Sequence, residues 1–414
     1  MSDRPSVLLR ARGHPNVRAS HGKTFEVTPD EAITQAGTCI LGVARTVEGD
    51  PAALRGHVDI TLSCGSVRQT TSGTINPLYL AGDPFIFRKD PLPKGNSFAI
   101  GCRHAASDFD RAIVDALREP DAELTIEAVS RQDATQGVVY VVGVPIGNDE
   151  DLSPRARRVL AGVDIIACED TRTSRPMLDG IGAKARRVSY HDHNEKERAR
   201  ELERALREGA RIAVISDAGV PGVADPGHRL VDLAHDVGAI VSPIPGPSAA
   251  LLAVVASGLG TDRFTFEGFL PRGAQARDEA LARMASRPGA SILYEAPHRL
   301  EATLNAIAAV FGEQPVVVAR ELTKPNEEIL RAPAAEILAA LTEGDRLRGE
   351  ITVVLPGAAE EAASDETPDW LEPMCRELLA ARVPTKAIAA AIRAATGWPK
   401  KRGYDYVVAL AERS

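Results

Sequence analysis

The sequence has 414 residues, of which 44% are hydrophobic and 26% are charged, and its formal net charge is −8. This composition is typical of a globular chain, and the length predicts two or three domains. The chain lacks the apolar run of roughly 18–20 residues that a membrane-spanning helix needs, and residues 1–16 lack the layout of a signal peptide, so we expect a cytoplasmic protein. The acidic balance gives no global sign of affinity for nucleic acid, although it leaves room for a local basic patch.

The first block, residues 1–130, predicts short strands separated by turns. It ends in the segment DFDRAIVDALREP, where Phe109, Ile113 and Leu117 recur at helical spacing. We expect a small α+β domain here, followed by a polar break at 131–137.

The five cysteines are scattered along the chain without any CxxC pair. An odd count without the spacing of metal ligands argues against a disulfide scaffold and against a zinc site. We therefore predict no metal.

The second block, residues 137–357, alternates apolar strands with amphipathic helices. Seven segments are predicted strands, namely GVVYVVGVP, DIIACED, RIAVISDAG, IVSPIPG, SILYEAP, PVVVARE and GEITVVLPG. This order predicts an open α/β sheet covered by helices. An acidic linker follows at 358–369, and the tail at 368–414 predicts a small helical domain of three short helices.

Distinctive loop motifs follow the predicted strands. They are GVPIGN (143–148), EDTRTSR (169–175), SDAGVPGVADPG (216–227), PGPSA (245–249), YEAPHR (294–299) and ARELTK (319–324), while SYHDHNE (189–195) lies between helices. Ligands of open α/β sheets bind beyond the carboxyl ends of the strands. Because glycine lets the backbone approach a ligand and proline stiffens a loop, we predict a preformed pocket built mostly from main chain.

A nicotinamide-binding Rossmann unit is the competing interpretation of the first motifs. Gly143 and Gly147 follow a strand, and an acidic pair ends the next strand roughly 20 residues further on. However, GVPIGN lacks the GxGxxG spacing, and Pro145 lies inside the turn where a pyrophosphate needs backbone donors. This interpretation is therefore disfavoured.

The block 137–357 resembles the ribosomal RNA small-subunit methyltransferase I family, whose members are 16S rRNA (cytidine-2'-O)-methyltransferases with the tetrapyrrole-methylase fold. The motifs PIGN, EDTR, YHDHNE, SDAGVPGVADPG, PGPSA, SGL, FEGFLP, YEAPHR and RELTK occur in the family's order. The resemblance implies a core of two α/β subdomains, S-adenosyl-L-methionine as methyl donor, a cytidine ribose in the decoding region of the small ribosomal subunit as acceptor, and a homodimer. Carried over by position, the implied donor-binding residues are Pro145, Gly147, Asp217, Ala218, Gly219, Val223, Ala224, Pro245, Pro247, Ser248 and Ala249.

Methyl transfer from a sulfonium is an in-line displacement that is assisted by positioning and by a base or cation near the hydroxyl. The candidate catalytic residues are Lys324, Glu321, Arg320, Glu295 and His298. Two alternatives stay open. Arg320 paired with Glu295 or Glu321 would brace the strand ends, and Lys324 would contact a phosphate instead of acting as a base.

The candidate RNA-binding residues are Asp170, Arg172, His191, His193, Asn194, Lys400, Lys401 and Arg402. His191 and His193 are spaced like a metal clip, but they lack a third ligand. A group of basic residues near them favours a patch for the RNA backbone, the alternative being a solvated helix face. Its members are Arg155, Arg157, Arg158, Arg172, Arg175, Lys184, Arg186 and Arg187.

The N-terminal block resembles a small domain family, described from archaeal genomes, that has no assigned function. Two other functions for the whole chain stay open: a methyltransferase of the same fold acting on a tetrapyrrole or other small molecule, and a binding module dominated by the N-terminal domain. The pocket loops and the motifs EDTR, YHDHNE and RELTK favour the RNA enzyme.

Overall fold

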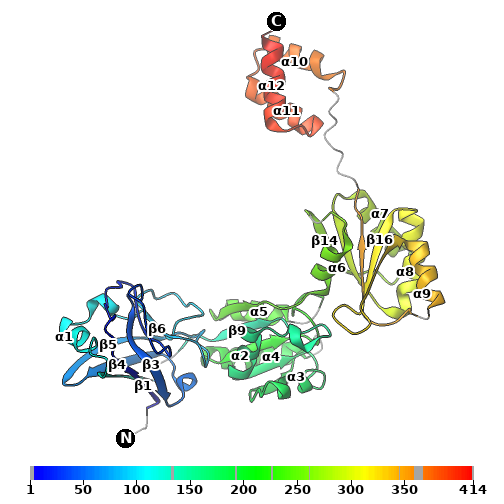
Figure 1. Ribbon diagram of the computed structural model, residues 1–414. Helices are drawn as coiled ribbons and strands as arrows, with labels where there is room; N and C mark the ends of the chain where they lie inside the picture. Colours follow the sequence, from blue (N-terminus) through cyan, green and yellow to red (C-terminus); the bar gives the residue numbers. More distant parts are fainter. Residues whose placement is uncertain are drawn as a thin grey trace. The chain divides into compact units, whose positions relative to one another are not determined.

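The computed structural model describes residues 4–131, 135–191, 194–224, 227–260, 262–344, 346–358 and 367–412. They belong to two compact units, Met1–Ala249 and Ala250–Ser414 (Figure 1). Among the helices of these ranges, none has the length and apolar character needed to cross a bilayer.

The first unit begins with a closed barrel in the strand order β1-β3-β2-β6-β7-β5-β4-β8, with β8 paired to β1. The strands are β1 Ser6–Arg12, β2 Thr24–Val27, β3 Ile40–Glu48, β4 His57–Cys64, β5 Val67–Ile75, β6 Phe85–Arg88, β7 Ala99–Ile100 and β8 Glu123–Ser130. Side chains alternate between core and solvent along β4 and β8, as the two-residue period of a strand requires. Phe25 and Phe87 stack in the core with ring centroids 4.3 Å apart. The helical part of this expected α+β domain is α1, Arg111–Ala116, with two short 3-10 turns.

The first unit continues with a parallel sheet in the order β11-β10-β12-β9-β13. Its strands are β9 Val138–Val142, β10 Ile165–Cys168, β11 Arg186–Ser189, β12 Arg211–Ile215 and β13 Ile240–Ile244. The connecting helices are α2 Pro154–Gly162, α3 Arg175–Gly180, α4 Glu195–Arg207 and α5 His228–Asp236, and α6 Ala249–Ser257 leads into the second unit. Because all five strands are parallel, their carboxyl ends meet at one edge, as the sequence predicts.

The second unit holds a mixed sheet in the order β14-β15-β18-β16-β17, in which only β14 and β15 run parallel. The strands are β14 Phe264–Phe269, β15 Ala290–Glu295, β16 Pro315–Arg320, β17 Glu328–Pro333 and β18 Ile351–Leu355. The helices are α7 Ala274–Ser286, α8 Pro297–Phe311 and α9 Ala334–Glu343. The strands β11, β14 and β17 are not among the seven predicted from the sequence.

The tail forms three helices, α10 Leu371–Ala380, α11 Thr385–Thr396 and α12 Lys400–Ala411. They pack around a small core that includes Cys375, Ile392 and Trp398. The predicted helical domain is therefore confirmed.

Candidate active site

Three of the predicted loops meet beyond the carboxyl ends of β9, β12 and β13. Val144 and Gly219 exchange backbone hydrogen bonds of 2.8 Å and 3.2 Å, which join the loops after β9 and β12. Gly143 and Gly246 join the loops after β9 and β13, because a Cβ atom on Gly143 would stand 2.6 Å from the Cα atom of Gly246. Only a residue without a side chain allows this approach of two backbones.

Gly219 lies at the crest of the loop after β12. Its φ is +78°, a left-handed conformation that favours glycine. A Cβ atom at this position would lie 3.5 Å from Cγ2 of Ile146 and 3.7 Å from the carbonyl oxygen of Pro247. The crest therefore packs against both neighbouring loops.

A cavity of about 190 Å³ opens beside these loops. It is lined by Val144, Pro145, Gly147, Asp149, Thr173, Ser174, Pro176, Met177, Ser216 and Asp217. Pro145, Gly147 and Asp217 are donor-binding residues implied by the resemblance. The hydroxyls of Thr173, Ser174 and Ser216 were not selected from the sequence, although they belong to the motifs EDTRTSR and SDAGVPGVADPG.

Asp217 ties the loop after β10 to the loop after β12. The backbone amide of Asp170 donates to Oδ1 of Asp217 over 3.2 Å, and the amide of Asp217 donates to Oε2 of Glu169 over 3.2 Å. Burial raises the pKa of Asp217 above its ordinary value, and the charge of Asp170 adds to this effect. The reciprocal contacts hold the EDTR and SDAG motifs in one fixed arrangement.

Asp170 also holds the guanidinium of Arg172. Nη2 of Arg172 lies 2.7 Å from Oδ2 of Asp170, and the arginine side chain is 86% exposed. Hydrogen bonds from the side chain and the backbone of Arg172 lower the pKa of Asp170 to about 2. The pair presents a cation to solvent next to the cavity-lining residue Thr173.

The other donor-binding candidates lie on the same three loops. Ala218 accepts a hydrogen bond of 3.0 Å from the hydroxyl of Ser216 through its carbonyl oxygen. Ala224 has a φ of +63°, which is uncommon for a residue with a side chain. Pro245, Pro247 and Ser248 lead into α6, which begins at Ala249, and Val223 precedes Ala224.

The described residues of the YHDHNE segment follow β11 and precede α4. The side-chain oxygen of Asn194 accepts from the amide of His191 over 2.9 Å, and its Nδ2 donates to the carbonyl of Ser189 over 3.0 Å. Asn194 therefore holds the backbone at Ser189 and His191, and the predicted residue His193 lies outside the described residues. Within the described ranges, no three His, Cys, Asp or Glu side chains are arranged to hold a metal ion.

Much of the predicted basic patch is engaged in contacts within the chain. Arg187 pairs with Asp179 at 2.7 Å, and Arg186 pairs with Glu201. Arg158 lies 3.5 Å from Asp83 of the barrel. These pairs favour structural roles for the three arginines and leave Arg172 as a more exposed cation.

The second unit gathers the candidate catalytic residues at one edge of its sheet. Glu295 ends β15 and Arg320 ends β16, and both are in register with Ile351 of β18. Since β15 and β16 flank the same strand, the YEAPHR and ARELTK motifs emerge at the same edge. His298 lies exposed in the first turn of α8.

Glu295 is buried beneath this edge, with 3% of its surface exposed. It accepts hydrogen bonds of 2.6 Å from the hydroxyl of Thr303 and 2.8 Å from the amide of Ala296, and it pairs with Arg299 at 3.4 Å. These contacts join β15 to α8.

Arg320 is also buried, and it forms the strand-end ion pair that one of the alternatives predicted, but with another partner. It donates to Oε2 of Glu328 over 3.1 Å and to the carbonyl of Arg348 over 3.1 Å. The prediction that Arg320 pairs with Glu295 or Glu321 is wrong, because the unpredicted strand β17 places Glu328 directly opposite Arg320.

Lys324 lies between two carboxylates. Its Nζ is 3.2 Å from Oε1 of Glu321 and 3.2 Å from Oε1 of Glu350. Partial burial opposes the charged form, but the hydrogen bonds and charges of the two carboxylates outweigh it and raise the pKa of Lys324 above its ordinary value. The amide of Glu350, and then Lys324, lower the pKa of Glu321. This environment favours a cation that contacts phosphate over a general base.

The family Tetrapyrrole (Corrin/Porphyrin) Methylases matches residues 138–338, and Domain of unknown function (DUF371) matches residues 9–130. Ribosomal RNA small subunit methyltransferase I from Micromonospora olivasterospora is 40% identical over 295 residues, which cover 70% of this chain and 94% of that protein. The protein of the same name from Escherichia coli O157:H7 is 43% identical and covers 67% of this chain and 96% of its own length. The protein of the same name from Mesorhizobium japonicum is 43% identical, and the match covers 67% of this chain and 93% of that protein.

These matches extend over almost the whole length of each relative and include the loops that surround the cavity. The chain therefore belongs to the family of ribosomal RNA small subunit methyltransferase I, within the tetrapyrrole methylases.

Proposed function

We propose that this chain transfers a methyl group from S-adenosyl-L-methionine to the ribose 2'-hydroxyl of a cytidine in the decoding region of 16S rRNA. The relatives named ribosomal RNA small subunit methyltransferase I support an rRNA substrate, and methyltransferases of the tetrapyrrole methylase family use S-adenosylmethionine. The observation that carries the proposal is the meeting of the loops after β9, β12 and β13 beside one cavity.

The residues around the cavity fit such a donor. S-Adenosylmethionine supplies a methyl group activated by a sulfonium, and it also bears an ammonium, a carboxylate and ribose hydroxyls. The cavity offers the carboxylate of Asp217 and the hydroxyls of Thr173 and Ser216 for these groups. The backbone amides at the start of α6, around Ser248 and Ala249, suit a carboxylate. We therefore propose the eleven residues implied by the resemblance as the donor site.

We assign the acceptor side to the edge formed by the YEAPHR and ARELTK motifs. Lys324 is proposed to contact an RNA phosphate as an ammonium, with Glu321 positioning it. Glu295 and Arg320 are proposed as positioning residues, since both are buried and paired. His298 is proposed to accept the proton that the 2'-hydroxyl loses, because it is exposed at this edge and histidine is the commonest general base of enzymes.

RNA binding is assigned to two further places. Arg172, held by Asp170, is proposed to face RNA beside the donor cavity. His191, His193 and Asn194 are proposed as further RNA-binding residues. In the tail, Lys400 and Lys401 are exposed, and the guanidinium of Arg402 lies 3.9 Å from the ring centroid of Trp398. Cations on a helix are suited to the phosphate backbone.

We also propose that the enzyme acts as a homodimer in the cytoplasm. Helix α6 exposes Leu251, Leu252 and Val255, the last at 74%, and subunit interfaces bury apolar surface of this kind. Light scattering should give twice the chain mass of 44.0 kDa, and the mass of a single chain would contradict the dimer.

The test of the function uses the purified chain, labelled S-adenosylmethionine and 30S subunits from a strain that lacks the modification. We expect label in 16S rRNA, at a linkage that resists alkaline hydrolysis, because a 2'-O-methyl group removes the nucleophile of that cleavage. Label on a base, or no label with intact subunits, would overturn the proposal.

A further inference from the structure

We infer that the N-terminal barrel is a permanent structural partner of the parallel sheet in the first unit, docked at the edge opposite the donor cavity, and is not a tethered module. The relatives are covered over 94% and 96% of their lengths, whereas this chain is covered over 70% and 67%. The barrel matches a separate family over residues 9–130.

A loop of the barrel completes the hydrophobic core beneath α2. Leu80, between β5 and β6, is only 4% exposed and belongs to the same apolar cluster as Tyr140, Val159 and Leu160. A Cβ atom on Gly162, at the end of α2, would lie 3.4 Å from Cδ2 of Leu80. One face of the methylase helix is thus buried by a side chain from the barrel.

The same loop places a buried carboxylate against α2. Asp83 accepts a hydrogen bond of 3.0 Å from the amide of Leu80, and its Oδ1 lies 3.5 Å from Nη2 of Arg158. Burial raises the pKa of Asp83. Removing the guanidinium of Arg158 while the junction stays closed would therefore leave this buried carboxylate without its cation.

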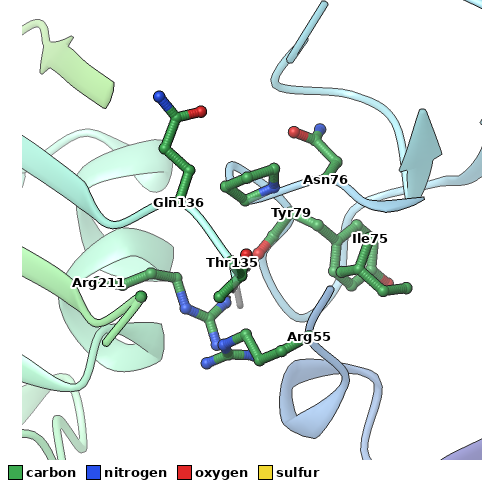
Figure 2. Close-up of a pocket in the computed structure, with 9 residues that line it drawn as sticks. Arg55, Ile75, Asn76, Tyr79, Thr135, Gln136 and Arg211 are labelled. Carbon is green, nitrogen blue, oxygen red and sulfur yellow. Dashed lines mark hydrogen bonds between the residues drawn. The ribbon is translucent and has the colours of Figure 1, made fainter. Parts of the chain in front are cut away.

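Arg211 crosses from the sheet into the barrel, as Figure 2 shows. It begins β12, is buried, and donates to the carbonyl oxygens of Tyr79 and Ala52 over 2.9 Å each. Asp164, which precedes β10, accepts from the amide of Arg211 over 2.7 Å and lies 3.6 Å from Nη2 of Arg55 in the barrel. Three polar links, made by Asp83, Arg211 and Asp164, therefore accompany the apolar one.

These contacts lie at the amino ends of the parallel strands. Arg211 and Asp164 stand at the beginnings of β12 and β10, whereas the cavity lies beyond the carboxyl ends. The docked barrel therefore leaves the donor cavity open.

Helix α2 links the docked barrel to the cavity. The helix begins at Pro154, shortly after the cavity residue Asp149, and Nη2 of Arg157 donates to the carbonyl of Asp149 over 3.1 Å. Loosening the barrel should therefore loosen the cavity loop. This last step rests on the proposed function, since it is read out as affinity for the methyl donor.

Hydrogen exchange of the full chain tests the docking. We expect Leu80→Ala to speed exchange of the amides of β9, β10 and β12 together with those of the barrel by about tenfold or more. The matched control is Leu92→Ala, also in the barrel but 65% exposed, and it should change neither. Faster exchange confined to the barrel would overturn the inference.

A double-mutant cycle keeps the test independent of any one variant. Asp83→Asn and Arg158→Ala lie on opposite sides of the junction, and their effects on sheet exchange should be non-additive. Additive effects would contradict a direct contact between the barrel and α2.

Calorimetry with S-adenosylmethionine tests the coupling. Leu80→Ala should bind the donor several-fold more weakly than the unmodified chain, and equal affinities would overturn the coupling. If the unmodified chain binds no donor at all, the proposed function fails, while the exchange experiment still decides the docking.

Discussion

At position 219 the backbone adopts a φ of +78° and packs against Ile146 and Pro247. A β-branched side chain is strained in this conformation by about 1–2 kcal/mol, and it would also press on both neighbouring loops. We expect Gly219→Val to weaken donor binding by about tenfold or more, measured by calorimetry.

The control for this substitution is Gly182→Val. Gly182 has a φ of +70°, but nothing lies within 4 Å of its ideal Cβ atom, and it does not line the cavity. Gly182→Val should lower the free energy of unfolding about as much as Gly219→Val does, but it should leave the affinity for the donor unchanged. Equal loss of affinity in both variants would show that strain alone, and not the pocket, is responsible.

Lys324 is predicted to act as a cation at every pH at which the enzyme works. Its pKa is raised above the ordinary value, so its contribution to stability is complete below the unfolded pKa and is lost only as the pH rises through the folded value, above about pH 10. Lys324→Met should lower kcat/KM by about tenfold or more, and Lys324→Arg should retain part of the activity.

The pH profile decides between the two roles of Lys324. Between about pH 6 and 9, kcat/KM should depend on pH in the same way in the unmodified enzyme and in Lys324→Arg. A step that disappears with the substitution would identify Lys324 as the general base instead.

A buried hydrogen bond is one of the contacts that link β15 to α8. The hydroxyl of Thr303 donates to Glu295 over 2.6 Å, and both residues are buried. Thr303→Val leaves the carboxylate short of a donor, which should lower the free energy of unfolding by about 1–3 kcal/mol in denaturant titrations.

The matched control is Thr342→Val on α9, where the threonine hydroxyl donates to the carbonyl of Leu338 at an exposed position. We expect a change of less than about 0.5 kcal/mol for the control. Equal effects in the two variants would contradict a structural role for the carboxylate of Glu295.

The elements that the sequence failed to predict are all edge strands. β11, β14 and β17 lie at the edges of their sheets, and each is poor in buried apolar side chains. Along β17 the exposed side chains of Ile329 and Arg331 alternate with partly buried ones, and β14 carries a glycine at its bulge. The predicted strands β9, β10, β12, β15, β16 and β18 bury nearly continuous apolar runs, which give a clear signal.

In the candidate site, too, some features could be predicted from the sequence and others could not. The position of the motifs after parallel strands predicts that their loops gather at one edge, and the loops after β9, β12 and β13 do meet there. Which side chains pair with one another could not be predicted from the motifs. The partner of Arg320, for example, depends on the register of the unpredicted strand β17. Likewise, the contacts of Asp217 with Asp170 and Glu169 depend on the neighbouring loop 47 and 48 residues away.

For the whole molecule, the tail is predicted to supply affinity for RNA without affecting the donor site. Replacing both Lys400 and Lys401 by alanine should weaken binding to 30S subunits and lower the magnitude of the slope of log K against log salt by about 1.4–1.8, as the loss of two phosphate contacts requires. Arg376→Ala is the control, because Arg376 already pairs with Glu372 at 2.8 Å. An unchanged slope in the double variant would exclude the tail from the RNA interface.

The most direct test of the account is calorimetry of the full chain with S-adenosylmethionine and its demethylated product. We expect one site per chain, competition between the two ligands, and loss of affinity in Gly219→Val but not in Gly182→Val. A well-folded protein that binds neither ligand, even in the presence of ribosomal subunits, would contradict it.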